Sequence, residues 1–462
     1  MELFCKNTHK KTCFSNLLTM KEYSILGKSI FYSPANCSFS FSCKDNESEN
    51  EPSPHFAFDA LGQNFNIKAF TFCINLSNSC NLNCDYCFNK AKTEKRVTFD
   101  ESIRYLEKMF QAFPDGEKYY VDLSGKGEPL LYLNDIVKIA EWCKEKQNAI
   151  NKEVLPQLVC NGTLLTKKVA KKLQKSGVLF GVSIDGDEIA HNLHRKTLAN
   201  KETFLLIIQN IKSIKNKKYI GCATTLTKDV FPLLEAINYL SYYFDTLSFR
   251  PVRGELRFDD EAVVNWNKEY DRLSLRLLDD IEKDDKALFL RLMNGDDFFG
   301  RYLNRAFGRQ MVLNRCDAGI SRFSVDIDGK IYGCPALSMF KDKCLTKIGV
   351  LYSKERFLQQ AHQCLDCDFK IFCGGSCEVE VADGADLKNM CNFKKHLILL
   401  ANYLQLKCEE INPKLDLFLQ DFAMKKMRRN ERDKELIAFL KSHPHYSFTK
   451  GKKVFDKKHP SY

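Results

Sequence analysis

Hydrophobic and polar positions between residues 69 and 252 repeat in one order: a short apolar run, a polar turn and an amphipathic stretch. The apolar runs predict strands, which are "AFTFCINLS", "YYVDLSG", "PQLVCNGT", "LFGVSIDG", "YIGCATTLT" and "FDTLSFRPV". The amphipathic stretches between them, such as "TFDESIRYLEKMFQAF", predict helices. Such alternation implies parallel strands with helices outside them. About six units are fewer than a closed eight-fold barrel needs, so the predicted fold class is α/β, a partial (β/α)6 TIM-like barrel.

The pattern changes on both sides of this barrel. Residues 1–66 form a predicted small N-terminal element, in which "YSILGKSIFYSPANCSFSFSC" alternates like short strands and "KDNESENEPSP" follows as a polar linker. The barrel is assigned to 67–300, with a charged helical part from about 255 to 310. Residues 301–395 are cysteine-rich, with short strands expected from 316 to 391. Residues 396–462 are predicted to be helical and basic.

Composition limits the class of protein. The 462 residues are 44% hydrophobic and 28% charged, which is typical of soluble globular proteins and long enough for one large domain with appendages or for two to three domains. No apolar run reaches the length of a membrane span, and no secretion signal is recognised, so we expect a cytoplasmic protein without a membrane partner. The net charge of +11 gathers near the C-terminus, where it predicts a solvated helix face. No RNA-reader motif accompanies it, and we expect no nucleic-acid partner.

The 20 cysteines indicate metal, because disulfides are rare in a reducing cytosol. Cys80, Cys84 and Cys87 lie within "SCNLNCDYCF", directly after the first predicted barrel strand, where the loops of such folds build active sites. A structural zinc site needs four ligands, and no fourth cysteine or histidine follows nearby. A [4Fe–4S] cluster held by three thiolates leaves one iron free for a substrate or cofactor.

The spacing C-x3-C-x2-C, with aromatic Tyr86 before the last cysteine, resembles the signature of the radical S-adenosylmethionine (SAM) enzymes. This resemblance implies that the free iron chelates the methionine amino and carboxylate groups of SAM. Reduction by an electron donor, a flavodoxin or ferredoxin, then releases a 5′-deoxyadenosyl radical. The radical chemistry belongs to the cofactor, and the protein supplies position and water exclusion.

Later strand ends extend the resemblance. "SGKGEPLL" is similar to the family's Gly-Gly-Glu-Pro motif at the methionine amino group, except that Lys126 replaces the first glycine; "CNGTLL", with Asn161 and Gly162, is similar to the ribose-side loop; and "VSIDG" with "HNLHR" is similar to the segment that holds the carboxylate. Arginine suits a carboxylate because its planar fork can donate twice. The resemblance assigns SAM contacts to Tyr86, Gly127, Glu128, Pro129, Asn161, Ser183 and Arg195.

A second group of cysteines resembles the SPASM extension of peptide- and protein-modifying radical SAM enzymes, which carries auxiliary iron–sulfur clusters. Its members are Cys316, Cys334, Cys364, Cys367, Cys373, Cys377 and Cys391. Four residues separate Gly329 from Cys334, in the pattern Gly-x4-Cys. A zinc ribbon is the alternative. The family pattern implies that Cys364, Cys367, Cys373 and Cys391 hold the second auxiliary cluster and that Cys316, Cys334 and Cys377 hold the first. That leaves one ligand of the first cluster to be supplied by a substrate thiolate or by Cys344.

The resemblance predicts a peptide maturase that abstracts hydrogen from a ribosomal precursor peptide or protein and forms a thioether or carbon–carbon crosslink. Residues 1–66 are a candidate leader-peptide module, which would bind by adding a strand. The alternatives are an anaerobic sulfatase-maturating enzyme and, in another class, a non-catalytic zinc or cysteine-rich binding protein. In the sulfatase-maturating relatives an aspartate beside the Gly-x4-Cys element is the base, whereas Pro335 follows Cys334 here; Asp326 and Asp328 are interpreted as turn residues.

Overall fold

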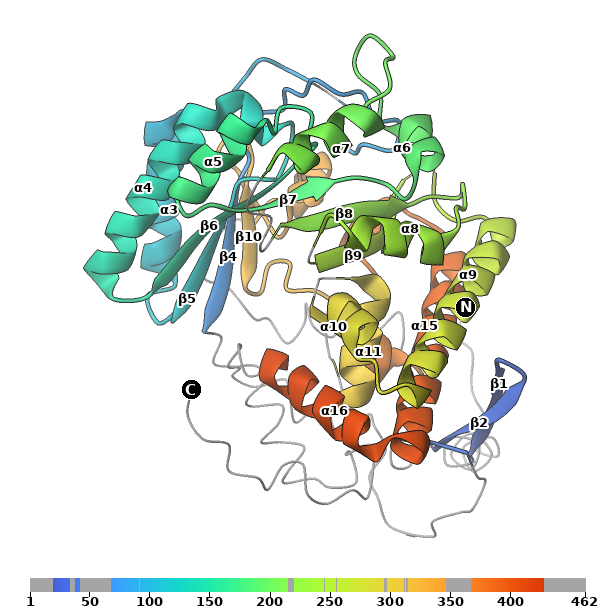
Figure 1. Cartoon of the computed structure of the whole chain (residues 1–462). Coiled ribbons are helices and arrows are strands. Elements are labelled where there is room, and N and C mark those ends of the chain that lie inside the picture. The colour runs from blue at the N-terminus through green and yellow to red at the C-terminus, as the bar shows by residue number, and fades with distance from the viewer. Residues whose placement is uncertain are drawn as a thin grey trace, which may run out of the picture.

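The protein is described here from a computed structural model (Figure 1). The residues that the structure describes are 20–33, 38–41, 68–90, 92–214, 220–244, 246–254, 256–294, 297–310, 312, 315–345 and 367–427. Within them, no helix is long and apolar enough to cross a membrane.

Six parallel strands form the body of the main sheet, and each pairs with the next in the chain. They are β4 (Ala69–Ile74), β5 (Lys118–Asp122), β6 (Glu153–Cys160), β7 (Leu179–Ser183), β8 (Gly221–Leu226) and β9 (Thr246–Pro251). The helices between them are α3 (Phe99–Ala112), α4 (Leu133–Ile150), α5 (Lys167–Lys175), α6 (Glu188–His194), α7 (Phe204–Ser213) and α8 (Leu233–Ser241). The predicted partial barrel of six units is confirmed, and within the described residues β9 pairs with no strand beyond β8.

Alternation along β4 explains how the sheet holds its helices. Phe70 and Phe72 point into the layer between sheet and helices, where the Phe70 ring lies 4.7 Å from that of Phe113. Thr71 and Cys73 point to the opposite, concave face, because successive strand residues face opposite sides. Large aromatic side chains of β4 therefore pack against the helices. The alternate residues of the strand face the concave side of the sheet and are available to the site there.

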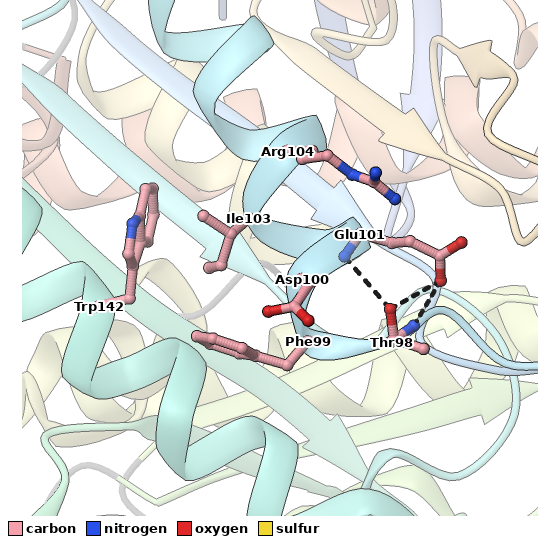
Figure 2. Close-up of a pocket in the computed structure, with 7 residues that line it drawn as sticks. All are labelled: Thr98, Phe99, Asp100, Glu101, Ile103, Arg104 and Trp142. Atoms are coloured by element: carbon pink, nitrogen blue, oxygen red, sulfur yellow. Dashed lines mark hydrogen bonds between the residues drawn. The ribbon is translucent and has the colours of Figure 1, made fainter.

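The helix after β4 begins where the sequence predicts. Thr98 and Glu101 form a reciprocal capping box, in which the Thr98 hydroxyl accepts from the Glu101 amide and the Glu101 carboxylate accepts from the Thr98 amide (Figure 2). Such caps satisfy amides that have no partner within the helix. Trp142 of α4 and Ile103 face each other across a surface depression beside this cap, and the residues that line it include none of the predicted cluster or SAM residues.

The cysteine-rich part continues the barrel sheet. After helices α9 (Asp260–Glu282), α10 (Ala287–Asn294) and α11 (Phe298–Phe307), strand β10 (Arg322–Val325) pairs in parallel with β4, and β11 (Ile331–Tyr332) pairs antiparallel with β10. Figure 1 shows β10 beside β4. The carboxyl end of β10 therefore lies at the same edge of the sheet as the loop after β4.

Short strands are right for β10 and β11 but wrong for residues 370–391. That segment contains α13 (Lys370–Cys373), α14 (Glu378–Ala382) and the first turn of α15 (Lys388–Ile411). Val379 and Glu380 are both buried although they are adjacent, an arrangement that a two-sided strand does not give. The predicted C-terminal helices are confirmed in α15 and α16 (Pro413–Met427); residues 428–462 lie outside the described residues.

The N-terminal element contains the expected strands, β1 (Lys21–Ile25), β2 (Lys28–Ser33) and β3 (Ser38–Ser40), in one antiparallel sheet. This sheet rests on the cysteine-rich part, because Lys21 pairs with Asp368 at 2.7 Å and the Tyr23 ring lies 5.2 Å from Phe369. The predicted linker "KDNESENEPSP" lies outside the described residues.

Candidate active site

The loop after β4 brings Cys80, Cys84 and Cys87 together at the carboxyl edge of the sheet, and all three are partly buried. Burial raises the pKa of Cys84 to about 11, and the nearby thiolates of Cys87 and Cys80 add to the rise, whereas Arg195 opposes it. Three thiols that affect each other in this way repel as thiolates, and a shared cationic metal centre would relieve the repulsion. The donor set suits an iron–sulfur cluster.

The cysteine loop is fastened to the far side of the barrel. The Asn83 amide donates to the Lys196 carbonyl at 2.8 Å, and Leu82 forms a bridge with Thr197. His194 lies 2.9 Å from the Asp85 carboxylate through Nδ1. The loop thus spans from β4 to the segment after α6, and its conformation is set by contacts at both ends.

The loop after β5 meets the cysteine loop through Gly127 and Glu128. The Glu128 amide donates to the Ser79 carbonyl at 2.8 Å. Gly127 has a φ of 66°, and a Cβ there would lie 2.4 Å from the Ser79 carbonyl oxygen, so only glycine fits. Pro129, which follows Glu128, is buried at the first position of a 3-10 turn, Pro129–Tyr132.

Glu128 itself is buried and accepts two backbone hydrogen bonds, from Asn161 at 2.7 Å and from Leu130 at 3.0 Å. Burial raises the pKa of this carboxyl to about 7, although both hydrogen bonds work against the rise. The Asn161 side-chain amide donates to Asn81 at 2.8 Å and lies 4.0 Å from the Cys80 sulfur. Glu128 and Asn161 therefore connect the loops after β5 and β6 to the cysteine loop.

Arg195 is buried in an ion pair that the sequence does not reveal. Its Nε donates to Asp185 at 2.7 Å and its Nη2 donates to the other oxygen at 3.2 Å. The Tyr86 hydroxyl donates to the same carboxylate at 2.5 Å. Burial alone would raise the pKa of Asp185, but the charge and hydrogen bonds of Arg195 lower it. Ser183 lies two residues before Asp185, at the end of β7, and is partly exposed.

This arrangement modifies the role expected of Arg195. A SAM carboxylate would have to share the guanidinium with Asp185, because Nε and Nη2 are already used. The ring of Tyr86 lies 5.3 Å from the same guanidinium. Tyr86, Asp185 and Arg195 thus form one connected unit beside Cys84, and the assignment of Arg195 to the SAM carboxylate stays a prediction.

Lys126, at the position where the family has glycine, reaches the cysteine-rich part. Its ammonium lies 2.9 Å from Asp326, and both side chains are nearly buried, at 8% and 12% exposure. Asn75, at the end of β4, donates to the same carboxylate at 3.1 Å. Asp326 does lie in the expected turn, since the Gly329 amide donates to its carbonyl at 2.8 Å. Its carboxylate, however, joins β10 to the loop that carries Gly127. Asp328, the other expected turn residue, accepts from the Lys330 amide.

The predicted first auxiliary set, Cys316, Cys334 and Cys377, comes from two segments of the cysteine-rich part, one before and one after residues 346–366. Burial raises the pKa of Cys334 to about 11, and the thiolates of Cys377 and Cys316 contribute to the rise. Cys334, Cys377 and Cys344 also share one small hydrophobic cluster with Phe88, the residue after Cys87. Cys344 is therefore close enough in the fold to remain a candidate ligand, and the cysteine loop of the barrel contacts the same cluster.

The second auxiliary set has three members among the described residues. Burial raises the pKa of Cys391; the charge of Lys394 lowers it, and the thiolates of Cys373 and Cys367 raise it further. Cys364 lies outside the described residues. Among the residues that are described, no three His, Cys, Asp or Glu side chains are placed to hold a single metal ion.

Sequence reasoning missed several residues of this region. In the sequence, Asp185 forms part of the turn signal "DG", which does not indicate an ion pair. Its position at a strand end, ten residues before Arg195, is the one signal that could have suggested Arg195 as its partner. His194 and Asn81 gave no separate signal, because their partners come from other parts of the chain. The residues that fasten the loops are thus harder to predict than the cysteines.

Comparisons with known proteins agree with this geometry. Residues 74–232 match the family model of the Radical SAM superfamily, which confirms the resemblance predicted for the barrel. The chain is 25% identical over 413 residues to an uncharacterized protein of Archaeoglobus fulgidus, covering 83% of this chain and 93% of that protein. It is 22% identical over 333 residues to the cysteine-type anaerobic sulfatase-maturating enzyme of Clostridium perfringens, covering 65% of this chain and 86% of the enzyme.

Among solved structures, the fold is similar to "Native anSMEcpe with bound AdoMet and Kp18Cys peptide". The TM-score is 0.57 at 20% sequence identity, and the match covers 74% of this chain and 100% of that one. At this identity the similarity concerns the fold alone. It reaches well beyond the part of the chain that the family model matches.

Proposed function

The chain is an enzyme with a radical SAM domain, and from this premise we propose that it is a maturase that crosslinks a ribosomally made peptide. As a radical SAM enzyme it uses a [4Fe–4S] cluster with SAM; two auxiliary clusters are part of the proposal. The observation that carries it is the sorting of nine described cysteines into three sets of mutually interacting thiols, one in the barrel and two in the cysteine-rich part.

In this proposal Cys80, Cys84 and Cys87 hold the cluster that binds SAM. When bound and reduced by an electron donor such as a flavodoxin or ferredoxin, that cluster with SAM would supply a 5′-deoxyadenosyl radical able to take one hydrogen atom from the peptide. Closing the crosslink would then release one proton to solvent and pass one electron to an auxiliary cluster of the proposal, so that the peptide loses two hydrogens in all. The protein positions SAM through the residues that the resemblance assigns, and Tyr86 is held in place by its hydrogen bond to Asp185.

The auxiliary clusters are assigned to Cys316, Cys334 and Cys377 and to Cys367, Cys373 and Cys391, with Cys364 as the fourth ligand of the second cluster. The fourth position of the first cluster is open to a thiolate of the peptide. Cys377 is buried, four of the other thiols are partly buried and Cys316 is exposed. The soft thiolate ligands support the assignment, because they suit iron and sulfide.

A peptide substrate is supported by the similarity to the structure of anSMEcpe with the bound Kp18Cys peptide. The N-terminal sheet offers a place for a leader segment, because β1 pairs on one side only within the described residues and an extended peptide can add to such an edge. We assign a cytoplasmic location, in keeping with cysteines that stay unpaired in the described residues.

Sulfatase maturation is the competing activity, favoured by the relative from Clostridium perfringens. It requires a base near Cys334, and Pro335 occupies the neighbouring position. Asp326, a carboxylate eight residues before Cys334, is bound to Lys126 and Asn75. These contacts favour crosslinking over sulfatase maturation.

The test is anaerobic reconstitution followed by iron and zinc analysis. The proposal expects about twelve irons per chain, at four per cluster, and a loss of about four in the variant that replaces Cys80, Cys84 and Cys87 by alanine. Incubation with SAM, a reductant and a cysteine-containing precursor should give 5′-deoxyadenosine and a product lighter by about two hydrogens. A product that reacts with hydrazine would reveal an aldehyde and favour sulfatase maturation, whereas zinc in place of iron in the cysteine-rich part would refute the auxiliary clusters.

A further inference from the structure

Two cations are buried beside the second auxiliary set. Arg305, in the last turn of α11, is 7% exposed, and Lys394, on α15, is 2% exposed. Within the described part of the chain neither side chain forms an ion pair with a carboxylate. An isolated buried charge strongly destabilises the fold, so each cation requires a nearby anion.

Both cations point to the same cysteines. Arg305 donates through Nη1 to the carbonyls of Phe372 at 2.6 Å and Cys373 at 3.2 Å. These contacts cap the end of α13, and the guanidinium also lies 5.4 Å from the centre of the Tyr302 ring. Within the described residues, however, no carboxylate neutralises its charge. Lys394 lies three residues after Cys391, so the two side chains share one face of α15.

The other charged side chains near Cys367, Cys373 and Cys391 do not neutralise the positive charge of Arg305 and Lys394. Asp368, next to Cys367, is paired with Lys21 at 2.7 Å. Lys395, also near Cys367 and Cys391, adds a further positive charge, although it is partly exposed. The second auxiliary set is therefore surrounded by net positive charge.

The first auxiliary set differs. Arg315, close to Cys377 and Cys316, is nearly buried, and its Nη1 lies 3.1 Å from the carboxylate of Glu380, which is buried. Around Cys334 the cation is Arg253, which is exposed. A paired arginine contributes little net field, so the two auxiliary sets have unequal electrostatic surroundings.

We propose that Arg305 and Lys394 are the counter-charges of the second auxiliary cluster and hold its reduction potential above that of the first. The inference rests on the proposed function, since the anion it requires is a cluster held by Cys367, Cys373 and Cys391. A cluster ligated by thiolates is anionic, and adding one electron makes it more negative. Fixed cations stabilise the reduced form more than the oxidised form and raise the potential. Electrons would therefore collect on the second cluster, and the two residues act by position, without touching the substrate.

The direct test is a redox titration of the reconstituted chain, followed by electron paramagnetic resonance. Substituting alanine for Cys80, Cys84 and Cys87 removes the SAM cluster, and Cys391→Ala identifies the signal of the second auxiliary cluster. In this background Lys394→Met and Arg305→Gln should each lower the potential of the second cluster. The expected change is about tenfold in its reduced-to-oxidised ratio at a fixed poise, or about 59 mV for one electron. The first cluster should not shift.

Matched controls separate charge from structure. Arg305→Lys keeps the charge and should keep the potential. Lys407→Met removes a lysine from the same helix that is paired with Glu410 at 2.7 Å, and it should leave both potentials unchanged. Arg309→Gln removes a second buried arginine, one that is paired with Glu409, and it should behave like Lys407→Met.

A second readout does not depend on the spectrum. Without a cluster the ammonium of Lys394 is an unpaired buried charge, so Lys394→Met should raise the melting temperature of the metal-free chain and lower that of the reconstituted chain. Equal shifts in both forms, or unchanged potentials at full iron content, would overturn the inference while leaving the proposed function intact. If Cys373→Ala loses no iron, the second auxiliary cluster does not exist. That result would refute the auxiliary-cluster part of the proposed function, and the inference would fall with it.

Discussion

The ion pair between Lys126 and Asp326 gives a test of how the barrel and the cysteine-rich part are joined. Lys126 follows β5 and Asp326 follows β10, so the pair links two segments 200 residues apart, with the ammonium 2.9 Å from the carboxylate. Both side chains are nearly buried, and Asn75 donates to the same carboxylate. Lys126→Met removes one partner at little change of volume and leaves Asp326 without its cation.

The expected magnitude follows from burial. Coulomb's law gives about 6 kcal/mol for unit charges at 2.9 Å in an effective dielectric of about 20. Desolvation of both groups offsets most of this attraction in the wild type. Removing Lys126 alone leaves the desolvation cost of Asp326 in place, and we expect a loss of about 3–5 kcal/mol in the free energy of unfolding. The double variant with Asp326→Asn has no unpaired charge, and it should recover to within about 1 kcal/mol of the wild type.

The assay is urea unfolding of the reduced, metal-free chain, monitored by tryptophan fluorescence, with hydrogen exchange of β10 as the local readout. The control is Lys330→Met, which breaks the pair with Asp328 in the same hairpin, at 51% and 38% exposure. Exposed pairs contribute about 0–1 kcal/mol. If Lys126→Met costs no more than Lys330→Met, or if the double variant is as unstable as the single one, the argument from burial is wrong.

Three further predictions concern other parts of the chain. Burial lowers the pKa of His191 to about 3, so its contribution to stability is complete above about pH 6.5 and is lost as the pH falls toward 3. His191→Asn should therefore flatten the dependence of the free energy of unfolding on pH between about 3 and 6.5, and an unchanged dependence would show that His191 does not cause it. Cys344→Ala should leave the first auxiliary cluster sensitive to peptide binding; sensitivity gained only in this variant would make Cys344 the fourth ligand. Asp368→Asn removes the partner of Lys21 and Tyr23 and should speed hydrogen exchange in β1–β3 but not in β5–β9; equal exchange would show that aromatic packing alone holds the N-terminal sheet.

The barrel could be predicted because its signals are local. Each of the six units has an apolar strand and an amphipathic helix, and α3 follows its Thr98 cap within the stretch that the sequence predicts to be helical. The three cysteines of the loop after β4 are recognised from their spacing within eight residues of the chain. Neither signal depends on residues that are distant in the chain.

The joins between parts could not be predicted, because they depend on distant residues. Strand β10 has only four residues, "RFSV", and its pairing with β4 joins positions 251 residues apart, such as Phe323 and Phe72. Asp326 was correctly placed in a turn, but its partner Lys126 could not be inferred from either segment. The carboxylate of Asp185 was hidden for the same reason, because its contacts come from Tyr86 and Arg195.

These joins make the cysteine-rich part a continuation of the barrel. Its strand β10 covers the edge of β4, its carboxylate Asp326 holds the loop of Gly127, and its hydrophobic cluster includes Phe88, directly after Cys87. Removing the part after residue 300 would expose the β4 edge to other chains and would leave Lys126 without its partner. The barrel alone would keep the contacts of the cysteine loop with the segment after α6 but would lose those at Phe88 and at the loop of Gly127. The conformation of the cysteine loop therefore depends in part on the cysteine-rich part.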